Sequence, residues 1–151
     1  MSKITTVYDE ILTILAAIFP EKKRIFNPYS LTDNPQHNLR DSYGLIKTDT
    51  NRVSSEFKGF TDEHGFQVVL TKEVVRMESQ TDQVDDVHRE LIEDAFELRE
   101  RIYRYDKLGL TSEVVNTEIG AVSGVTQFYN EKAKFVSISI DFSILVNENF
   151  N

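Results

Sequence analysis

The chain of 151 residues has the length of one domain, and its composition, 40% hydrophobic and 28% charged, is typical of a folded globular protein. It contains no cysteine, which excludes disulfides, thiolate metal cages and a cysteine nucleophile. The net charge of −8 argues against a protein that grips nucleic acid, because such binding depends on Lys and Arg side chains that neutralise phosphates. An acidic surface can instead line a passage through which DNA slides without binding.

The first element predicted is an amphipathic helix. Apolar residues recur at steps of three and four from Ile4 to Phe19, and Pro20 ends the pattern. Asp9 and Glu10 interrupt the apolar run early, so the segment is too short and too charged to span a membrane or to act as a signal sequence. We therefore expect a cytoplasmically made protein with no membrane partner.

The next stretch, about residues 26–55, is polar and irregular. Asn27-Pro28 and Asn34-Pro35 are turn signals, and only Tyr43 to Thr48 has the character of a strand. A long loop of this kind in a compact domain is either a working surface or disordered, and both alternatives stay open. If the loop is a working surface, Asn34 is a candidate interface residue.

A long strand is predicted from Gly65 to Met77. Phe66, Val68 and Leu70 alternate with more polar residues, and the apolar content after Thr71 suggests a bulge. The preceding Asp62-Glu63-His64-Gly65 has the composition of a solvated turn, which is where we expect the strand to begin.

The clearest helix in the sequence follows. Val84, Val87, Leu91, Ala95, Leu98 and Ile102 are spaced three, four, four, three and four residues apart. Thr81 or Asp82 can cap its N-terminus, and Gly109 follows its end. The apolar stripe is expected to pack on the domain's own sheet rather than in an intermolecular coiled coil.

A meander of strands completes the chain. Two short strands are predicted at 113–119 and 122–129, then a turn at 130–133 and a long strand from Lys134 to Val146. Consecutive strands with no helix between them favour an α+β fold, and we expect a single domain that comprises residues 1–151. Its antiparallel or mixed sheet is covered on one face by the two main helices.

No catalytic or cofactor motif is apparent. Nucleotide-binding glycine motifs and a nucleophile elbow are missing, and the three histidines, His37, His64 and His88, are far apart in the sequence. Asp85 and His88 share a helix face, but two side chains do not make a metal site. We therefore expect neither an enzyme nor a bound cofactor or metal.

The last strand has one face built of small polar residues, namely Ser137, Ser139, Asp141 and Ser143. This face can be a solvent face, or it can let a neighbouring subunit approach closely, because small side chains leave room for a second surface. Both interpretations stay open, and they make Ser137, Ser139 and Asp141 candidate interface residues beside Asn34.

The order of elements resembles the tail terminator proteins of long-tailed bacteriophages. The resemblance extends over the whole chain and depends on element order and on four segments: NPYSLTDNP at 27–35, LRDSYGLI at 39–46, VDDVHRELIEDAFELRERIYRY at 84–105 and SISIDFSILVNE at 137–148. The family has no catalytic signature.

The resemblance implies a small α+β protein of the virion neck that forms a hexameric ring. Such a ring caps the tail tube protein, ends tube growth and presents its other face to a head completion or connector protein, while DNA passes through its lumen. Two alternatives are another neck component, such as a head completion or stopper protein, and a small-molecule-binding domain or enzyme that uses a cavity between helix and sheet.

Overall fold

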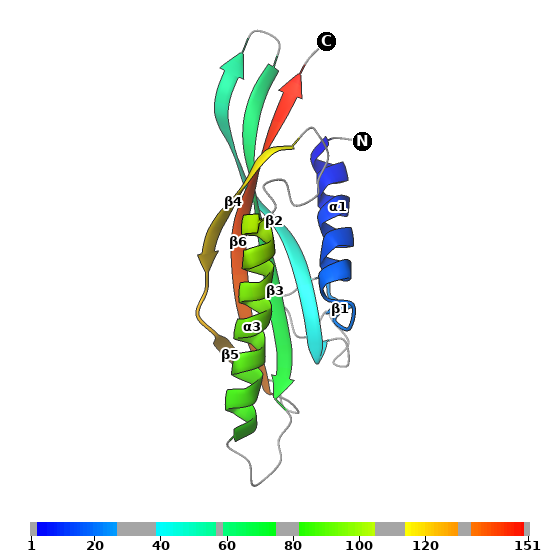
Figure 1. Cartoon of the computed structure of the whole chain (residues 1–151), viewed down its shortest axis with the longest axis vertical. Coiled ribbons are helices and arrows are strands. Elements are labelled where there is room, and N and C mark those ends of the chain that lie inside the picture. Colours follow the sequence, from blue (N-terminus) through cyan, green and yellow to red (C-terminus); the bar gives the residue numbers. More distant parts are fainter. Residues whose placement is uncertain are drawn as a thin grey trace.

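The computed structural model describes residues 3–26, 39–56, 59–74, 82–104, 114–129 and 134–149. Figure 1 shows an elongated molecule in which two helices run along a twisted sheet. The elements in chain order are α1 (Lys3–Ile18), β1 (Lys23–Arg24), β2 (Asp41–Glu56), β3 (Gly59–Val74), α3 (Asp82–Arg104), β4 (Val114–Val122), β5 (Thr126–Tyr129) and β6 (Lys134–Asn149). No helix among the described residues is both long and apolar enough to cross a membrane.

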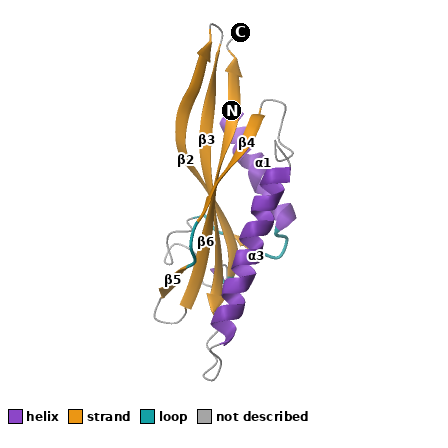
Figure 2. Cartoon of the chain, turned by 60° about the vertical axis from the view of Figure 1, so that its left-hand side comes forward, coloured by secondary structure: helices purple, strands orange, loops and turns teal. Residues whose placement is uncertain are grey.

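The sheet is mixed, and the predicted α+β class is confirmed. Its strand order is β1-β2-β3-β6-β4, with β5 also paired to β6. Only the β1–β2 pair is parallel, and the other pairs are antiparallel. Both helices lie on the same side of the sheet, as Figure 2 shows. We call this side the helix face.

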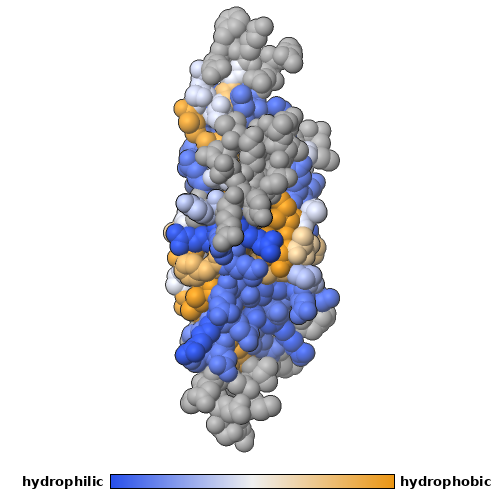
Figure 3. Space-filling view, viewed as in Figure 1, coloured by the Kyte–Doolittle hydropathy of each residue, from blue (hydrophilic) through white to orange (hydrophobic). Residues whose placement is uncertain are grey.

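The core fills the space between the helices and the helix face. Alternate residues of the two central strands point into it, and Phe66 of β3 stacks on Phe142 of β6 with ring centroids 5.6 Å apart. The helices contribute the apolar stripes seen in the sequence. Their buried core residues are Val7, Ile11 and Leu15 of α1 and Leu91, Ala95, Leu98 and Ile102 of α3. The outward surface of α3 is mostly hydrophilic (Figure 3).

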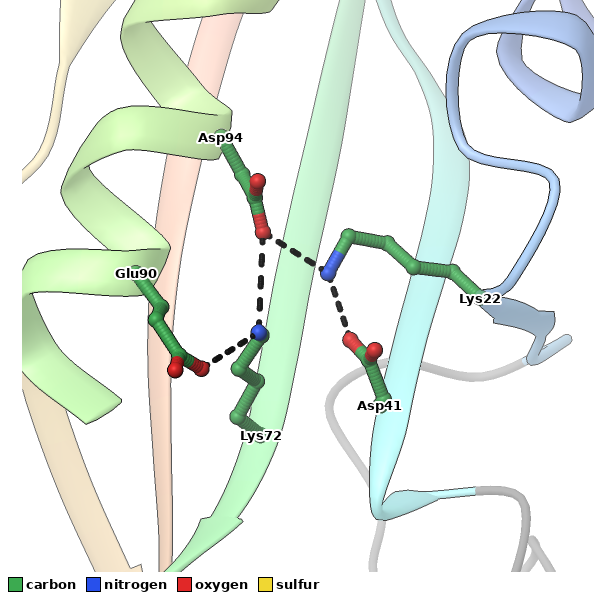
Figure 4. A network of polar contacts seen from close by, with 5 residues as sticks. All are labelled: Lys22, Asp41, Lys72, Glu90 and Asp94. Carbon is green, nitrogen blue, oxygen red and sulfur yellow. Dashed lines mark hydrogen bonds and ion pairs between the residues drawn. The ribbon is translucent and has the colours of Figure 1, made fainter. Parts of the chain in front are cut away.

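Ion pairs join the segment between α1 and β1, the sheet and α3 on this face (Figure 4). The Lys22 ammonium contacts the carboxylates of Asp41 in β2 and Asp94 in α3, the latter at 2.9 Å. Lys72 of β3 lies 2.9 Å from a Glu90 oxygen and 3.8 Å from Asp94. Burial lowers the pKa of Lys72, but the hydrogen bond to Glu90 and the nearby carboxylates outweigh it and raise the pKa overall.

The second strand corrects the prediction of a long polar loop. β2 extends from Asp41 to Glu56 and pairs with β3 over its whole length, whereas the sequence predicted a strand only over Tyr43–Thr48. The outer residues, 51–55, are all exposed, so neither face carries the apolar alternation that marks a half-buried strand. Their strand conformation comes from pairing with β3. Asn27, Asn34 and the rest of 27–38 lie outside the described residues.

The predicted turn at residues 62–65 is also wrong. β3 begins at Gly59 and runs through Asp62, Glu63 and His64, because β2 on one side and β6 on the other pair with these residues. The predicted bulge is not in the β3–β6 pairing, which is continuous from Gly59 to Val74. Val75–Met77 lie outside the described residues.

The remaining elements are of the type that the sequence predicted. The helices and the last strand are confirmed, although β6 continues three residues further, to Asn149. The break between the two short strands falls at 123–125 rather than near Gly120, because Val122 still pairs with Ile140. The predicted turn at 130–133 lies outside the described residues.

Candidate functional site

The sheet face opposite the helices carries the polar residues that the sequence singled out. We call it the serine face, because Ser137, Ser139 and Ser143 of β6 lie on it with Asp141 between them. In β3, Thr71 pairs with Ser137, Val69 with Ser139, Gln67 with Asp141 and Gly65 with Ser143. These partners lie on the same face, because paired residues of antiparallel strands point to the same side.

The serine face is acidic along the long strands. Its carboxylates include Glu63 and Glu73 of β3, Glu118 of β4 and Asp141 of β6. Over the described residues of β2, β3, β4 and β6, no Lys or Arg lies on it. The cations of these strands are on the helix face by register, and they are Lys47, Arg52, Lys72 and Lys134.

Two cations approach this face at its margin. Lys23 of the short strand β1 pairs in register with Ser42. Arg40, which precedes β2, places its Nε 3.1 Å from Glu73. In the part of the chain that the structure describes, the carboxylates in the middle of the face therefore have no cation of the long strands beside them in register.

One end of the serine face is covered. Ser42, Val69 and Thr71 are buried there. Beside them, Ile25, Leu39 and Phe135 form a second small apolar cluster, separate from the main core. This end of the sheet is consequently buried on both faces.

The middle of the serine face is open and forms a shallow groove of about 500 Å³. Asp141 is exposed in it, and its Oδ1 accepts a hydrogen bond of 2.9 Å from Gln67 Nε2. The other residues that line it are Thr48, Gly65, Phe66, Glu118, Gly120, Phe142 and Ser143. A groove with two carboxylates and small neutral groups is suited to water or to a polar surface, and it repels phosphate.

Two glycines keep the strands around the groove close together. A Cβ at Gly65 would lie 2.3 Å from Thr48 Oγ1, and one at Gly120 would lie 2.8 Å from the Asp141 carbonyl oxygen. Gly120 and Ala121 have no partner in β6, so β4 bulges at this point. The bulge places the Gly120 backbone directly against Asp141.

The structure brings three of the four candidate interface residues together. Ser137, Ser139 and Asp141 share the serine face. Ser137 and Ser139 are half-buried, and only Asp141 is exposed. The Ser139 backbone is held by Ser123, which exchanges hydrogen bonds of 2.8 and 2.9 Å with it. Asn34 lies outside the described residues.

The histidines and acids considered for metal binding do not converge. Asp85 pairs with Arg89 at 3.0 Å. Among the described residues, no three of His, Asp and Glu gather as metal ligands. His37 lies outside the described part of the chain. The sequence missed Gln67, the hydrogen-bond partner of Asp141, and the groove residues Gly65 and Glu118, because these belong to other strands whose register only folding sets.

His64 is buried rather than solvated in a turn. It is 6% exposed on the helix face, and its Nδ1 lies 3.0 Å from Thr50 Oγ1. Burial lowers the pKa of His64, the Lys47 charge lowers it further, and Asp62 partly opposes them. The folded protein therefore favours the neutral imidazole.

The space between α1 and the sheet is small and open. Its volume is about 260 Å³, and it is lined by Ile4, Thr5, Tyr8, Lys47 and Phe66. Lys47 and the Tyr8 phenol are the titratable groups among the described residues that line it.

Replacing Gly120 by Ala is expected to destabilise the protein by about 1–3 kcal/mol, because the new methyl group meets the backbone of Asp141. Gly124→Ala is the matched control, since a Cβ there has no atom within 4 Å, and its effect should stay within about 0.5 kcal/mol. Urea unfolding of the two variants measures both changes in the free energy of unfolding. Equal stabilities would contradict the close packing of β4 on β6.

The lowered pKa of His64 predicts a loss of stability in mild acid. Above the unfolded pKa of about 6.5 the side chain is neutral in both states. As the pH falls from there through the folded pKa, the unfolded chain binds the proton more readily and unfolding becomes easier. Urea unfolding at about pH 7.5 and about pH 5.5 should show a smaller loss for His64→Gln than for wild type. Equal losses would contradict a buried, neutral His64.

Comparison with protein-family models finds no match to this chain, and comparison with curated proteins finds none either. The chemistry of the serine face and the topology of the sheet are therefore the grounds on which a function is inferred.

Proposed function

We propose that this chain is a structural protein of the neck of a long-tailed bacteriophage, which forms a ring on the end of the tail tube in the manner of a tail terminator. The ring is hexameric, ends tube growth and offers its other face to a head completion or connector protein. The chain has no catalytic role and needs no cofactor.

The observation that carries this proposal is the acidic serine face. Its middle holds Glu63, Glu118 and Asp141, and the described residues of β2, β3, β4 and β6 place no Lys or Arg on this face. A surface that lines a DNA passage must not hold phosphates, and carboxylates repel them. We orient the serine face toward the lumen and the helix face toward the outside.

This orientation favours one of the two interpretations of Ser137, Ser139 and Asp141. The exposed Asp141 and the open groove around it fit a surface turned to solvent in the lumen. The contacts between subunits then use other parts of the sheet. In a closed ring, one end surface accepts the last tube ring and the other does not reproduce the acceptor, which stops growth.

Negative-stain imaging tests the ring directly. The purified protein alone should show rings, or its mixture with assembled tail tubes should show one additional ring at the tube end. The same protein incubated with tailless heads is the control, because a head completion or stopper protein would bind there instead. A monomer that leaves tube ends bare would contradict the proposal.

Reversing charges in the groove should create DNA binding without preventing ring formation. Glu118→Lys together with Asp141→Lys should make the ring retard double-stranded DNA at about 50 mM salt, and retardation should weaken steeply as salt rises. Wild type should not retard DNA.

The matched control reverses two exposed acids on α3, Asp86→Lys and Glu93→Lys, which changes the net charge equally on the helix face. This control should retard DNA far less than the groove variant. If both variants bind DNA equally, the position of the charge does not matter and the orientation of the serine face toward the lumen is wrong.

A further inference from the structure

The outer edge of β2 is shielded along the part nearest the helices. β1 pairs with it at Ser42 and Tyr43. The Tyr8 hydroxyl of α1 then donates to the carbonyl oxygen of Leu45 at 3.3 Å. Further along, the Lys47 ammonium donates to the carbonyl oxygens of Thr48 and Asp49 at 2.7 and 3.1 Å. Short edge strands and lysines of this kind keep a sheet edge from pairing with another chain.

The same strand loses this protection beyond Thr50. Residues 51–55 are exposed, and this end of β2 forms a hairpin with the start of β3 that projects past both helices (Figures 1 and 2). We call residues 51–56 and 59–62 the hairpin arm. No described strand pairs with the outer edge of β2 here. Val53 is 57% exposed and has no partner in β3, because the register shifts between Arg52 and Ser54.

The hairpin arm is held in shape from within. Arg52 lies 3.5 Å from Asp62 across the two strands, and its guanidinium sits 4.0 Å from the centre of the Phe60 ring. These cross-strand contacts join β2 to β3 on the helix face. The outer edge of β2 is thereby presented as an ordered strand rather than a loose loop.

The opposite end of the sheet has a second edge of the same kind. Among the described strands, β4 is the last in the sheet order and pairs only with β6. It spans Val114–Val122, and Gly120 and Ala121 in its bulge are exposed and have no partner in β6.

The two edges are complementary in direction. Because β2, β3, β6 and β4 are antiparallel in succession, β2 and β4 run in opposite directions. The β2 edge of one copy placed beside the β4 edge of another therefore continues the antiparallel sheet. The arm offers six residues to the nine of β4, which matches an ordinary strand length.

We propose that the hairpin arm of one copy pairs, along Asn51–Glu56 of β2, with the outer edge of β4 in the next copy. The partner is a second copy of this chain, recognised by main-chain hydrogen bonds. The two surfaces differ, so the contact is head-to-tail and repeats around a ring until it closes. This inference rests on the proposed ring and names the surfaces that build it.

Two proline variants test the pairing, because proline removes a donor from an edge. Val53→Pro disables the arm and Ala121→Pro disables β4. Each variant alone should be monomeric in solution by light scattering. Negative-stain imaging should show no ring of either variant at tube ends. Mixed together they should form a 1:1 heterodimer, since each retains the edge that the other lacks. Val53→Thr and Ala121→Ser are the controls and should still form rings.

Circular dichroism and urea unfolding show whether the proline variants fold. A second pair of variants needs no proline. The chain has no cysteine, so Val53→Cys combined with Ala121→Cys places one thiol on each edge. A bismaleimide that reaches about 10 Å, roughly three residues along a strand, should convert the double variant into a ladder of covalent multimers. Each single variant should give no product beyond a dimer.

The failures of the two proposals are distinguishable. Rings that persist in both folded proline variants, or a double cysteine variant that gives no ladder while rings are present, would overturn the edge pairing and leave the ring intact. A wild-type protein that is monomeric and leaves tube ends bare would overturn the ring itself.

Discussion

The pairing of β3 with β6 is the constraint on which the rest of the structure depends. The two strands pair without interruption from Gly59 and Asn149 to Val74 and Lys134. Because side chains alternate along a strand, this register sends Phe66 and Phe142 to the helix face and Gln67 and Asp141 to the serine face together. A slip of one residue would turn the serines of β6 into the core, so burial of the helix face fixes the polar face as well.

The irregular features of the sheet are confined to its outer strands. Register shifts occur in β2 near Lys47 and Arg52 and in β4 near Val114 and Gly120. The continuous central pair supplies the stable frame, while these bulges bring Thr48 against Gly65 and Gly120 against Asp141 and so shape the groove between them. They also leave Val53 and Ala121 without partners in their own sheet. One arrangement thus accounts for both surfaces to which a role is assigned, the acidic groove and the two edges.

The charged residues of the two faces differ in their partners. On the helix face, Lys22 and Lys72 are held between Asp41, Glu90 and Asp94, so the cations there are matched by acids (Figure 4). Along the middle of the serine face, Asp141 has an amide as its partner and no described Lys or Arg of the long strands lies near it in register. The acids in the middle of the serine face therefore lie on the face that we orient toward DNA.

The sequence by itself determined the elements whose pattern is local. The 3.6-residue stripes of α1 and α3 and the strict alternation of β6 each follow from burial of one side, so their type and approximate bounds could be read directly. It also separated the serine face from the core. Tertiary structure alone decided that Asn51–Ser55 form a strand, that His64 is buried, that Gln67 donates to Asp141 and that Glu118 lines the same groove. These features depend on pairing between residues far apart in the chain, and a polar stretch carries no local signal of the strand that will pair with it.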